Sequence, residues 1–328
     1  MAGEEKYYTL IGMDKVYTDY KFADAAKKSM EIKGDSDYPV PFSTEDDAEA
    51  FRQGKWDTYL KEHYARYQTD ADAIIYADGS VDTDKECPTG GYGIIIFFKS
   101  GEIICESAQL EDKENGKLLS KRYDMDGNLT EEKLLEYPVI PGAKEGFVKS
   151  GNNEAGEPEG ARRALELCFG ERGTKKVVLV YDSKTIKERY INGTTFKTTK
   201  PEHPANFYGE FCEKIKKEYG DDAVSFIHVE SHRGKAKGKK KAEPPYRIDE
   251  MEFLHAVFND LVDAMAKAEA GIGIVDRKEN INLVHIIPER QFKVETRKKL
   301  CREHNKAEIR ELLQLVLQKE WFRPMFTE

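Results

Sequence analysis

Four carboxylates in this chain stand where acidic side chains are usually avoided, on or beside strongly apolar segments. Asp78 and Asp182 each follow an apolar run typical of a buried strand, Glu157 opens a helical pattern, and Asp263 lies inside another. A carboxylate near a buried face is costly unless it is paired, protonated or bound to a metal. All four could lie at one end of a sheet, which predicts a site for divalent cations and, with it, phosphodiester hydrolysis.

This chemistry explains why four acids are needed together. Phosphodiester hydrolysis needs an activated water in line with the leaving oxygen and relief of charge at the phosphate. Two cations about 4 Å apart provide both, and clustered carboxylates can hold them that close. Hard oxygen ligands suit Mg²⁺ or Mn²⁺. Each acid alone is a weak signal, because an Asp after an apolar strand is also a common turn residue.

The bulk composition predicts a soluble, globular chain. Its 328 residues, 39% of them apolar, suffice for two domains or for one domain with additions. The longest apolar runs, such as 94–98, have the length of a strand, and the first residues lack the pattern of a signal peptide. Five cysteines without C-x-x-C spacing indicate free thiols in a reducing compartment, so we expect a cytoplasmic location and no membrane contact.

Charge is distributed unevenly along the chain. The net charge of −9 argues against a general polyanion binder, although binding depends on local charge. Residues 1–50 carry 6 Lys against 12 Asp and Glu, whereas residues 233–247 carry 7 Lys and Arg against one Glu. Such a basic run is usually a solvated loop. Its position beside His232 and before the helix of Asp263 favours phosphate contact instead.

Residues 1–53 have the pattern of a small α+β domain. Short strands and helices alternate in it, at 7–12, 15–18, 20–30, 38–44 and 43–53. Ser43 or Thr44 can cap the second helix, whose first turn is rich in acids. Residues 54–71 are polar and aromatic with little periodicity, which indicates a linker.

Residues 72–270 have the pattern of an α/β domain. Strands are predicted at 73–80, 90–98, 101–110, 177–181 and 224–229, and helices at 157–169, 183–191, 205–219 and 251–270. This order predicts a mixed five-stranded sheet with helices on both faces. Residues 108–147 are interpreted as an irregular polar insertion with a hairpin at 124–128, where an Asp-Gly turn is favoured over a calcium loop.

Residues 271–328 are predicted to form a helical C-terminal extension. A short strand is predicted at 282–287, and the pattern at 293–320 is helical, with apolar residues recurring at Ile309, Leu312, Leu313, Val316 and Leu317. A helix that packs on the rest of the chain is favoured over one reserved for a partner.

In this order, the segments resemble the type 1 ribonuclease H family over much of 73–270. The matching segments are IIYADGS, GGYG, NNEAGEPEGARRALE, VVLVYDS, VESH and NDLVDAMAKA. The resemblance implies a ribonuclease H-like fold and a metal-dependent endonuclease that cuts the RNA strand of RNA/DNA hybrids. The chain departs from the family pattern in the spacing before Glu157 and in the insertion at 108–147.

The resemblance also implies a role for each site residue. Asp78, Glu157, Asp182 and Asp263 would be the catalytic carboxylates that bind two Mg²⁺ ions, for which Mn²⁺ can substitute. His232 resembles the family's mobile histidine, which assists proton transfer and product departure. The products would carry 5′-phosphate and 3′-hydroxyl ends. The residues expected to contact the substrate are Gly79, Ser80, Asn152, Asn153, Ser183, Lys239, Lys240 and Lys241.

Residues 1–53 resemble the viroplasmin-like, hybrid-binding domain that precedes some ribonuclease H domains. The segments YYTLIG, VYTDYKFADA and PFSTEDDAEAF carry this resemblance. It implies hybrid binding, but the acidic charge repels a phosphate backbone and lysines are missing around 39–41. We therefore expect weak hybrid binding, and docking on a protein partner or on the catalytic domain. A protein partner is also considered for the C-terminal extension.

Two other functions stay open at this point. One is a nuclease of the same fold that acts on another duplex, such as double-stranded RNA. The other is a non-catalytic nucleic-acid binding protein with a silent site. The complete set of carboxylates argues against the second, because a silent site has no reason to keep four costly acids.

Overall fold

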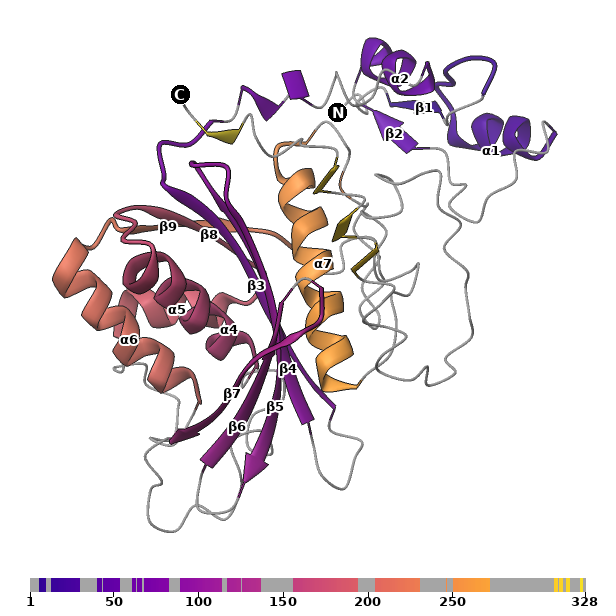
Figure 1. Cartoon of the computed structure of the whole chain (residues 1–328). Coiled ribbons are helices and arrows are strands. Elements are labelled where there is room, and N and C mark those ends of the chain that lie inside the picture. The colour runs from indigo at the N-terminus through magenta and orange to yellow at the C-terminus, as the bar shows by residue number, and fades with distance from the viewer. Residues whose placement is uncertain are drawn as a thin grey trace.

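In the computed structural model, a large mixed sheet lies between helices, and a smaller α+β unit precedes it (Figure 1). The structure describes residues 6–9, 13–29, 40–42, 44–53, 61–62, 64–66, 68–82, 89–113, 117–124, 126–136, 156–193, 204–230, 246, 250–271 and eight positions between 310 and 326. The architecture below is that of these residues.

The large sheet has seven strands in the order β7-β6-β5-β4-β3-β8-β9. Strands β4 to β7 form an antiparallel meander on one side of β3, and β8 and β9 run parallel to β3 on its other side. Their bounds are β3 Ala73–Asp82, β4 Thr89–Phe98, β5 Ile103–Lys113, β6 Lys117–Tyr123, β7 Leu129–Glu136, β8 Val177–Tyr181 and β9 Val224–His228.

Helices cover both faces of this sheet, as the sequence predicts. Helix α7 (Glu252–Ala270) packs on one face, and α4 (Gly156–Leu165), α5 (Lys184–Asn192) and α6 (Pro204–Tyr219) pack on the other. Successive side chains of a strand point to opposite faces. On β3, Ile74 and Tyr76 therefore join the core under α7, whereas Ile75 joins the core on the other face. Both faces of β3 are covered, which explains its nearly continuous apolar run.

The sheet has two more strands than the expected five, because much of the polar insertion joins it. Strand β6 alternates buried and half-buried residues along its whole length, and its inward side chains include Leu118, Ser120 and Arg122. The polar residues on the buried side hide the period of two that marks a half-buried strand. The expected hairpin is confirmed at the β6–β7 connection, where Gly127 has φ +81°.

The N-terminal elements form a two-stranded sheet with two helices. They are β1 (Tyr7–Thr9), α1 (Tyr20–Ser29), β2 (Val40–Phe42) and α2 (Glu45–Arg52). Strand β1 pairs antiparallel with β2, whereas the strand expected at 15–18 is only an isolated bridge between Tyr17 and Tyr8. Thr44 caps α2 as expected, because its hydroxyl accepts a hydrogen bond from the Asp47 amide at 3.2 Å. Phe42 and Phe51 belong to the same apolar cluster as the core under α7.

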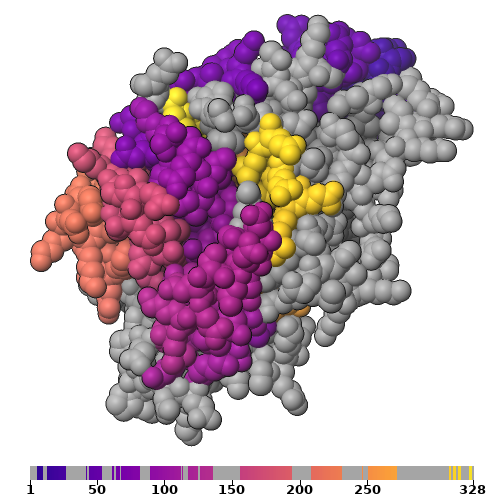
Figure 2. All heavy atoms as spheres, viewed as in Figure 1, coloured from indigo at the N-terminus to yellow at the C-terminus, as the bar shows by residue number. Residues whose placement is uncertain are grey.

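The described C-terminal residues pack on the rest of the chain. Leu313 and Met325 are buried in the core under α7, and the Thr69 amide donates a hydrogen bond of 2.8 Å to the Met325 carbonyl. Arg310 lies against Gly127 at the tip of the β6–β7 hairpin. Figure 2 shows these C-terminal residues, in yellow, beside the hairpin surface, in magenta. The strand expected at 282–287 lies outside the described residues.

The cysteines and the helices bear on the expectations of free thiols and of no membrane contact. Cys105, Cys168 and Cys212 are free thiols and buried, whereas Cys87 and Cys301 lie outside the described residues. Among the helices that the structure describes, none is both long and apolar enough to cross a bilayer.

Candidate metal centre

Asp78 and Asp182 lie just beyond the segment over which two adjacent parallel strands, β3 and β8, are paired. Asp78 is on β3, and Asp182 directly follows the last residue of β8. Because β3 and β8 are parallel neighbours, their carboxyl ends meet at one edge of the sheet. The fold therefore explains why two acids that are far apart in sequence come together.

Glu157 reaches the same place because α4 begins directly against β3. A Cβ atom built on Gly79 would collide with the backbone of Gly156 and Glu157. One built on Gly156 would likewise collide with the Gly91 carbonyl of β4. Glycine at these positions lets the first turn of the helix touch the strands. Glu157, in that first turn, is brought to the end of β3.

These three acids form a compact cluster. One carboxylate oxygen each from Asp78, Glu157 and Asp182 lies within 4.8 Å of the others. Asp78 and Glu157 are buried, and Asp182 is half-buried. Three oxygen ligands at this spacing fit a hard divalent cation such as Mg²⁺ or Mn²⁺.

The electrostatics of Asp78 reflect this crowding. Burial raises the pKa of the Asp78 carboxyl well above its ordinary value, and the charges of Asp182, Asp263 and Glu157 raise it further. The Gly79 amide opposes this shift by donating a hydrogen bond of 2.7 Å to Asp78 Oδ1. The dominant causes are desolvation and like charge, and a bound cation would relieve the second.

Asp263 approaches from the opposite face of the sheet, on α7. A Cβ atom on Gly91 or Gly93 would collide with the α7 backbone, so these two glycines let α7 lie close on β4. Asp263 acts on the pKa of Asp78 but is not a member of the three-acid cluster. Its Oδ2 instead accepts a 2.6 Å hydrogen bond from Lys267 Nζ.

The expected substrate contacts are only partly within the described residues. Ser80 is buried on β3, beside the start of α4, and Gly79 contacts that helix. Ser183 is the N-cap residue of α5, where its side chain makes no capping hydrogen bond. The other expected residues lie outside the described part of the chain, namely Asn152, Asn153, His232, Lys239, Lys240 and Lys241.

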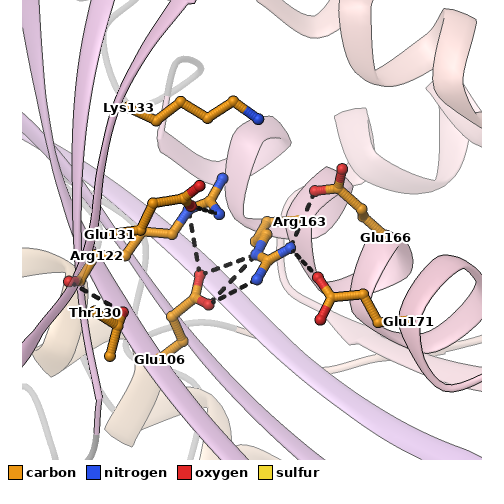
Figure 3. A pocket seen from close by; sticks show the side chains of 8 residues that line it. All are labelled: Glu106, Arg122, Thr130, Glu131, Lys133, Arg163, Glu166 and Glu171. Carbon is orange, nitrogen blue, oxygen red and sulfur yellow. Dashed lines mark hydrogen bonds and ion pairs between the residues drawn. The ribbon is translucent and has the colours of Figure 1, made fainter.

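A network of ion pairs around the largely buried Arg163 lies at the far end of α4. Arg163 lies six residues after Glu157, and its guanidinium contacts Glu106 of β5 at 3.2 Å. The same side chain pairs with Glu166 at 3.2 Å and Glu171 at 2.7 Å. Figure 3 shows Arg163 between Glu106 on one side and these two acids on the other. The ion pairs thus connect the helix of Glu157 to the antiparallel half of the sheet.

The two added strands extend this network. Arg122 of β6 is buried, lies 3.8 Å from Glu106, and also pairs with Glu131 of β7. Together with the residues around Arg163, these side chains line a polar cavity of about 410 Å³ (Figure 3). Glu106 also accepts a hydrogen bond from the Tyr92 hydroxyl at 2.9 Å.

Two polar interactions on α7 were not predicted from the sequence. Lys267 stands four residues after Asp263, a spacing that places both on one helix face and could have revealed the pair. His255 is buried and lies 2.8 Å from the Tyr76 hydroxyl through its Nδ1. Their separation of 179 residues gives no local signal.

Comparison with known proteins gives weak similarities. No protein-family model matches the chain, and no curated protein matches it. The N-terminal RNase H domain of rv2228c from Mycobacterium tuberculosis, solved as a fusion with maltose binding protein, is 12% identical with a TM-score of 0.28 and covers 49% of this chain and 83% of its own. RNase H1 from Halobacterium salinarum NRC-1 is 14% identical with a TM-score of 0.25 and covers 48% and 85%.

A third solved structure is the protease-reverse transcriptase of Prototype Foamy Virus. It is 15% identical to this chain with a TM-score of 0.31, and the match covers 63% of this chain and 21% of the viral protein. At these scores the likeness decides neither the fold nor the activity. The mixed α/β sheet and the three-acid cluster rest on the chain's own strand order and side-chain positions.

Proposed function

We propose that this chain is a metal-dependent endoribonuclease that hydrolyses the RNA strand of RNA/DNA hybrids. The observation that carries the proposal is the cluster of Asp78, Glu157 and Asp182, with one oxygen of each within 4.8 Å of the others. The resemblance of the sequence segments to type 1 ribonuclease H supports the substrate class. The strand order agrees with that resemblance, as do the positions of Asp78 on β3, Glu157 on α4, Asp182 directly after β8 and Asp263 on α7.

The donor set fits divalent cations rather than another cofactor. Carboxylate oxygens are hard ligands, and neither histidine nor cysteine belongs to the described cluster, which favours Mg²⁺ or Mn²⁺ over softer metals. When bound, two such ions would supply an activated water and neutralise charge at the phosphate. Asp78, Glu157 and Asp182 would hold them, with Asp263 contributing from α7.

The protein residues would divide the remaining work between positioning and proton transfer. Asp78 and Asp182 are positioned by two central strands, and Glu157 by the contact of α4 with β3, so the fold brings the ligands together without substrate. In the proposal His232 assists proton transfer to the leaving 3′-oxygen and helps the product depart. Cleavage then gives 5′-phosphate and 3′-hydroxyl ends.

Recognition of the hybrid would depend on the RNA 2′-hydroxyl and on the phosphates. Asn152, Asn153, Gly79, Ser80 and Ser183 are proposed for contacts near the scissile bond. The 2′-hydroxyl distinguishes RNA from DNA at such a site. The lysines 239–241 are proposed for the phosphate backbone, where charge supplies affinity without sequence preference.

The experiment that tests this function compares substrates on the full chain. Labelled RNA/DNA hybrid, double-stranded RNA and double-stranded DNA are incubated with Mg²⁺, with Mn²⁺ or with chelator. We expect cleavage of the RNA strand of the hybrid only, and only with a metal. Preferential cleavage of double-stranded RNA would assign the other duplex, and binding without cleavage of any substrate would show a non-catalytic protein.

We also propose that residues 1–53 adopt a viroplasmin-like fold that binds hybrid weakly. Phe42 and Phe51 join the core under α7, which supports docking on the catalytic domain. Tyr20, 38% exposed, is the candidate stacking aromatic, although its ring packs edge-on against Tyr8. Tyr20→Ala should leave hybrid affinity unchanged in filter binding. A tenfold loss, about 1.4 kcal/mol, would show that this unit stacks on bases.

A further inference from the structure

The fourth acid of the site already has a cationic partner within the protein. Asp263 Oδ2 and Lys267 Nζ are 2.6 Å apart on adjacent turns of α7. Both side chains are largely shielded from water, with exposed fractions of 14% for Asp263 and 18% for Lys267. Water and salt therefore screen this pair less than they screen an exposed pair.

Asp263 lies outside the cluster that the other three acids form. One carboxylate oxygen each of Asp78, Glu157 and Asp182 lies within 4.8 Å of the others. Asp263 is near enough for its charge to act on Asp78, yet its carboxylate is engaged with Lys267 instead of joining the cluster. The ammonium group thus stands at Asp263, whose charge acts on Asp78 from α7.

Two features of the helix explain how Lys267 is held. An acid four residues before a lysine is the favourable order for such a pair on a helix. Lys267 also lies in the last turn of α7, where the partial negative charge of the helix end favours a cation. The charge of the helix end does not depend on Asp263. Lys267 therefore keeps a favourable position even when Asp263 binds another group.

We propose that Lys267 is an internal counter-ion that competes with a divalent cation for Asp263. This inference rests on the proposed metal site and concerns the order in which that site fills. The three-acid cluster takes the first cation. The second cation recruits Asp263 only when the Asp263–Lys267 pair opens, so Lys267 weakens binding of the second ion.

The test measures Mn²⁺ binding to the full chain by calorimetry and by electron paramagnetic resonance, without substrate. Lys267→Met removes the charge and keeps the length of the side chain, and Lys267→Arg keeps the charge. The matched control is Lys113→Met, because Lys113 also pairs with a nearby acid, Glu111 at 2.8 Å, on β5, which β4 separates from the strand of Asp78. Circular dichroism verifies that each variant is folded, and Lys267→Gln replaces the methionine variant where that one is not.

We expect Lys267→Met to bind the weaker Mn²⁺ about tenfold more tightly, since a nearby positive charge is removed. Lys267→Arg and Lys113→Met should match the wild type. In an Asp263→Asn background the effect of Lys267→Met should fall to less than about twofold, because the two residues act as a unit.

Unchanged Mn²⁺ binding in Lys267→Met would overturn the proposal, as would an equal effect in the Asp263→Asn background. Asp182→Asn separates this failure from failure of the metal site. If Asp182→Asn weakens Mn²⁺ binding while Lys267→Met changes nothing, the metal site stands and the counter-ion role is wrong. If neither variant changes Mn²⁺ binding, both assignments are wrong.

Discussion

Asp78 and Asp182 continue the register in which the parallel strands β3 and β8 are paired. The ladder pairs Ala73 with Val177 and continues to Tyr76 with Val180, a constant offset of 104 residues. The same offset relates Asp78 to Asp182, two residues beyond the last registered pair. The register of the central strands therefore sets the two carboxylates side by side.

The contact of β3 with α4 completes this arrangement with Glu157. The resulting cluster raises the pKa of Asp78 through burial first and then through its charged neighbours. An acid whose pKa is higher in the folded state than in the unfolded state opposes folding once it is ionised. The site is therefore maintained at a cost in stability, and a bound cation or an uncharged replacement would reduce that cost.

The buried pair of Tyr76 and His255 predicts a specific acid sensitivity. Burial lowers the pKa of His255 from 6.5 to about 4. The unfolded chain then binds the proton more tightly, so stability is full above pH 6.5 and is lost as the pH falls towards 4. This histidine alone should account for about 3 kcal/mol of that loss. Denaturant unfolding at a series of pH values measures it.

His255→Gln should flatten this pH dependence by about the same amount, because glutamine keeps an acceptor for Tyr76 and does not titrate in this range. Parallel stability curves for wild type and His255→Gln would show that folding does not change the pKa of His255.

The ion pair of Arg163 and Glu106 should contribute strongly to stability. Both side chains are 11% exposed, and removing one partner of a buried pair typically costs about 3 kcal/mol or more. Arg163→Met should therefore destabilise the chain by about 3 kcal/mol in urea unfolding. The double variant with Glu106→Gln should recover part of that loss, because the Glu106 carboxylate is otherwise left with Arg122, 3.8 Å away, as its cationic partner.

Arg172 supplies the matched control for this prediction. It pairs with Glu102 at 2.8 Å, but both side chains are about 40% exposed, at 39% and 42%. Arg172→Met should cost less than about 1 kcal/mol. Equal losses for Arg163→Met and Arg172→Met would contradict the view that the buried network fixes α4.

The sequence predicted the fold and the main acids because both follow from local patterns. Buried parallel strands give continuous apolar runs, so the ends of β3 and β8 could be located to within two residues and their acids recognised. The pairs that cross the fold have no such pattern. Tyr76 and His255, or Glu106 and Arg163, meet only because distant elements pack together.

The insertion shows a second reason for failure. Strand β6 turns Arg122 and Ser120 inward, and a buried arginine disguises the alternation that would reveal a strand. Arg122 is stable there because Glu106 and Glu131 neutralise it, which only the folded arrangement reveals. The helical position of Asp263 could be predicted from the sequence. Its hydrogen bond with Lys267 was recognised only from the side-chain geometry.

His232 should matter less than the carboxylates. General acid–base assistance is typically worth about 10²-fold to 10⁴-fold in rate. His232→Ala should slow hybrid cleavage within that range yet leave measurable activity, in single-turnover and in steady-state assays. His63→Ala, in the linker 54–71, is the control histidine. Equal rates for wild type and His232→Ala in both assays would show that His232 takes no part in the reaction.

The basic run at 239–241 should contribute affinity through phosphate charge. Replacing Lys239, Lys240 and Lys241 with Gln should weaken hybrid binding and flatten its dependence on salt. Each lost phosphate contact lowers the slope of log K against log salt by about 0.9 on a duplex. A set of three glutamines at Lys113, Lys117 and Lys121 keeps the change in net charge equal. If the slope of log K against log salt for hybrid binding is the same in both triple variants, residues 239–241 have no specific role in binding.

The central claim is that Asp78 and Asp182 hold the metal ions that cleave the hybrid. Single-turnover cleavage of the RNA strand with Mg²⁺ tests it most directly, on wild type, Asp78→Asn, Asp182→Asn and the exposed control Asp70→Asn. Thermal unfolding in chelator checks the fold, and Asp78→Asn should be at least as stable as wild type at pH 7, because it removes a crowded charge. We predict that both site variants lose nearly all cleavage, whereas Asp70→Asn keeps it. Wild-type cleavage in chelator, or full cleavage by folded Asp78→Asn, would contradict the account.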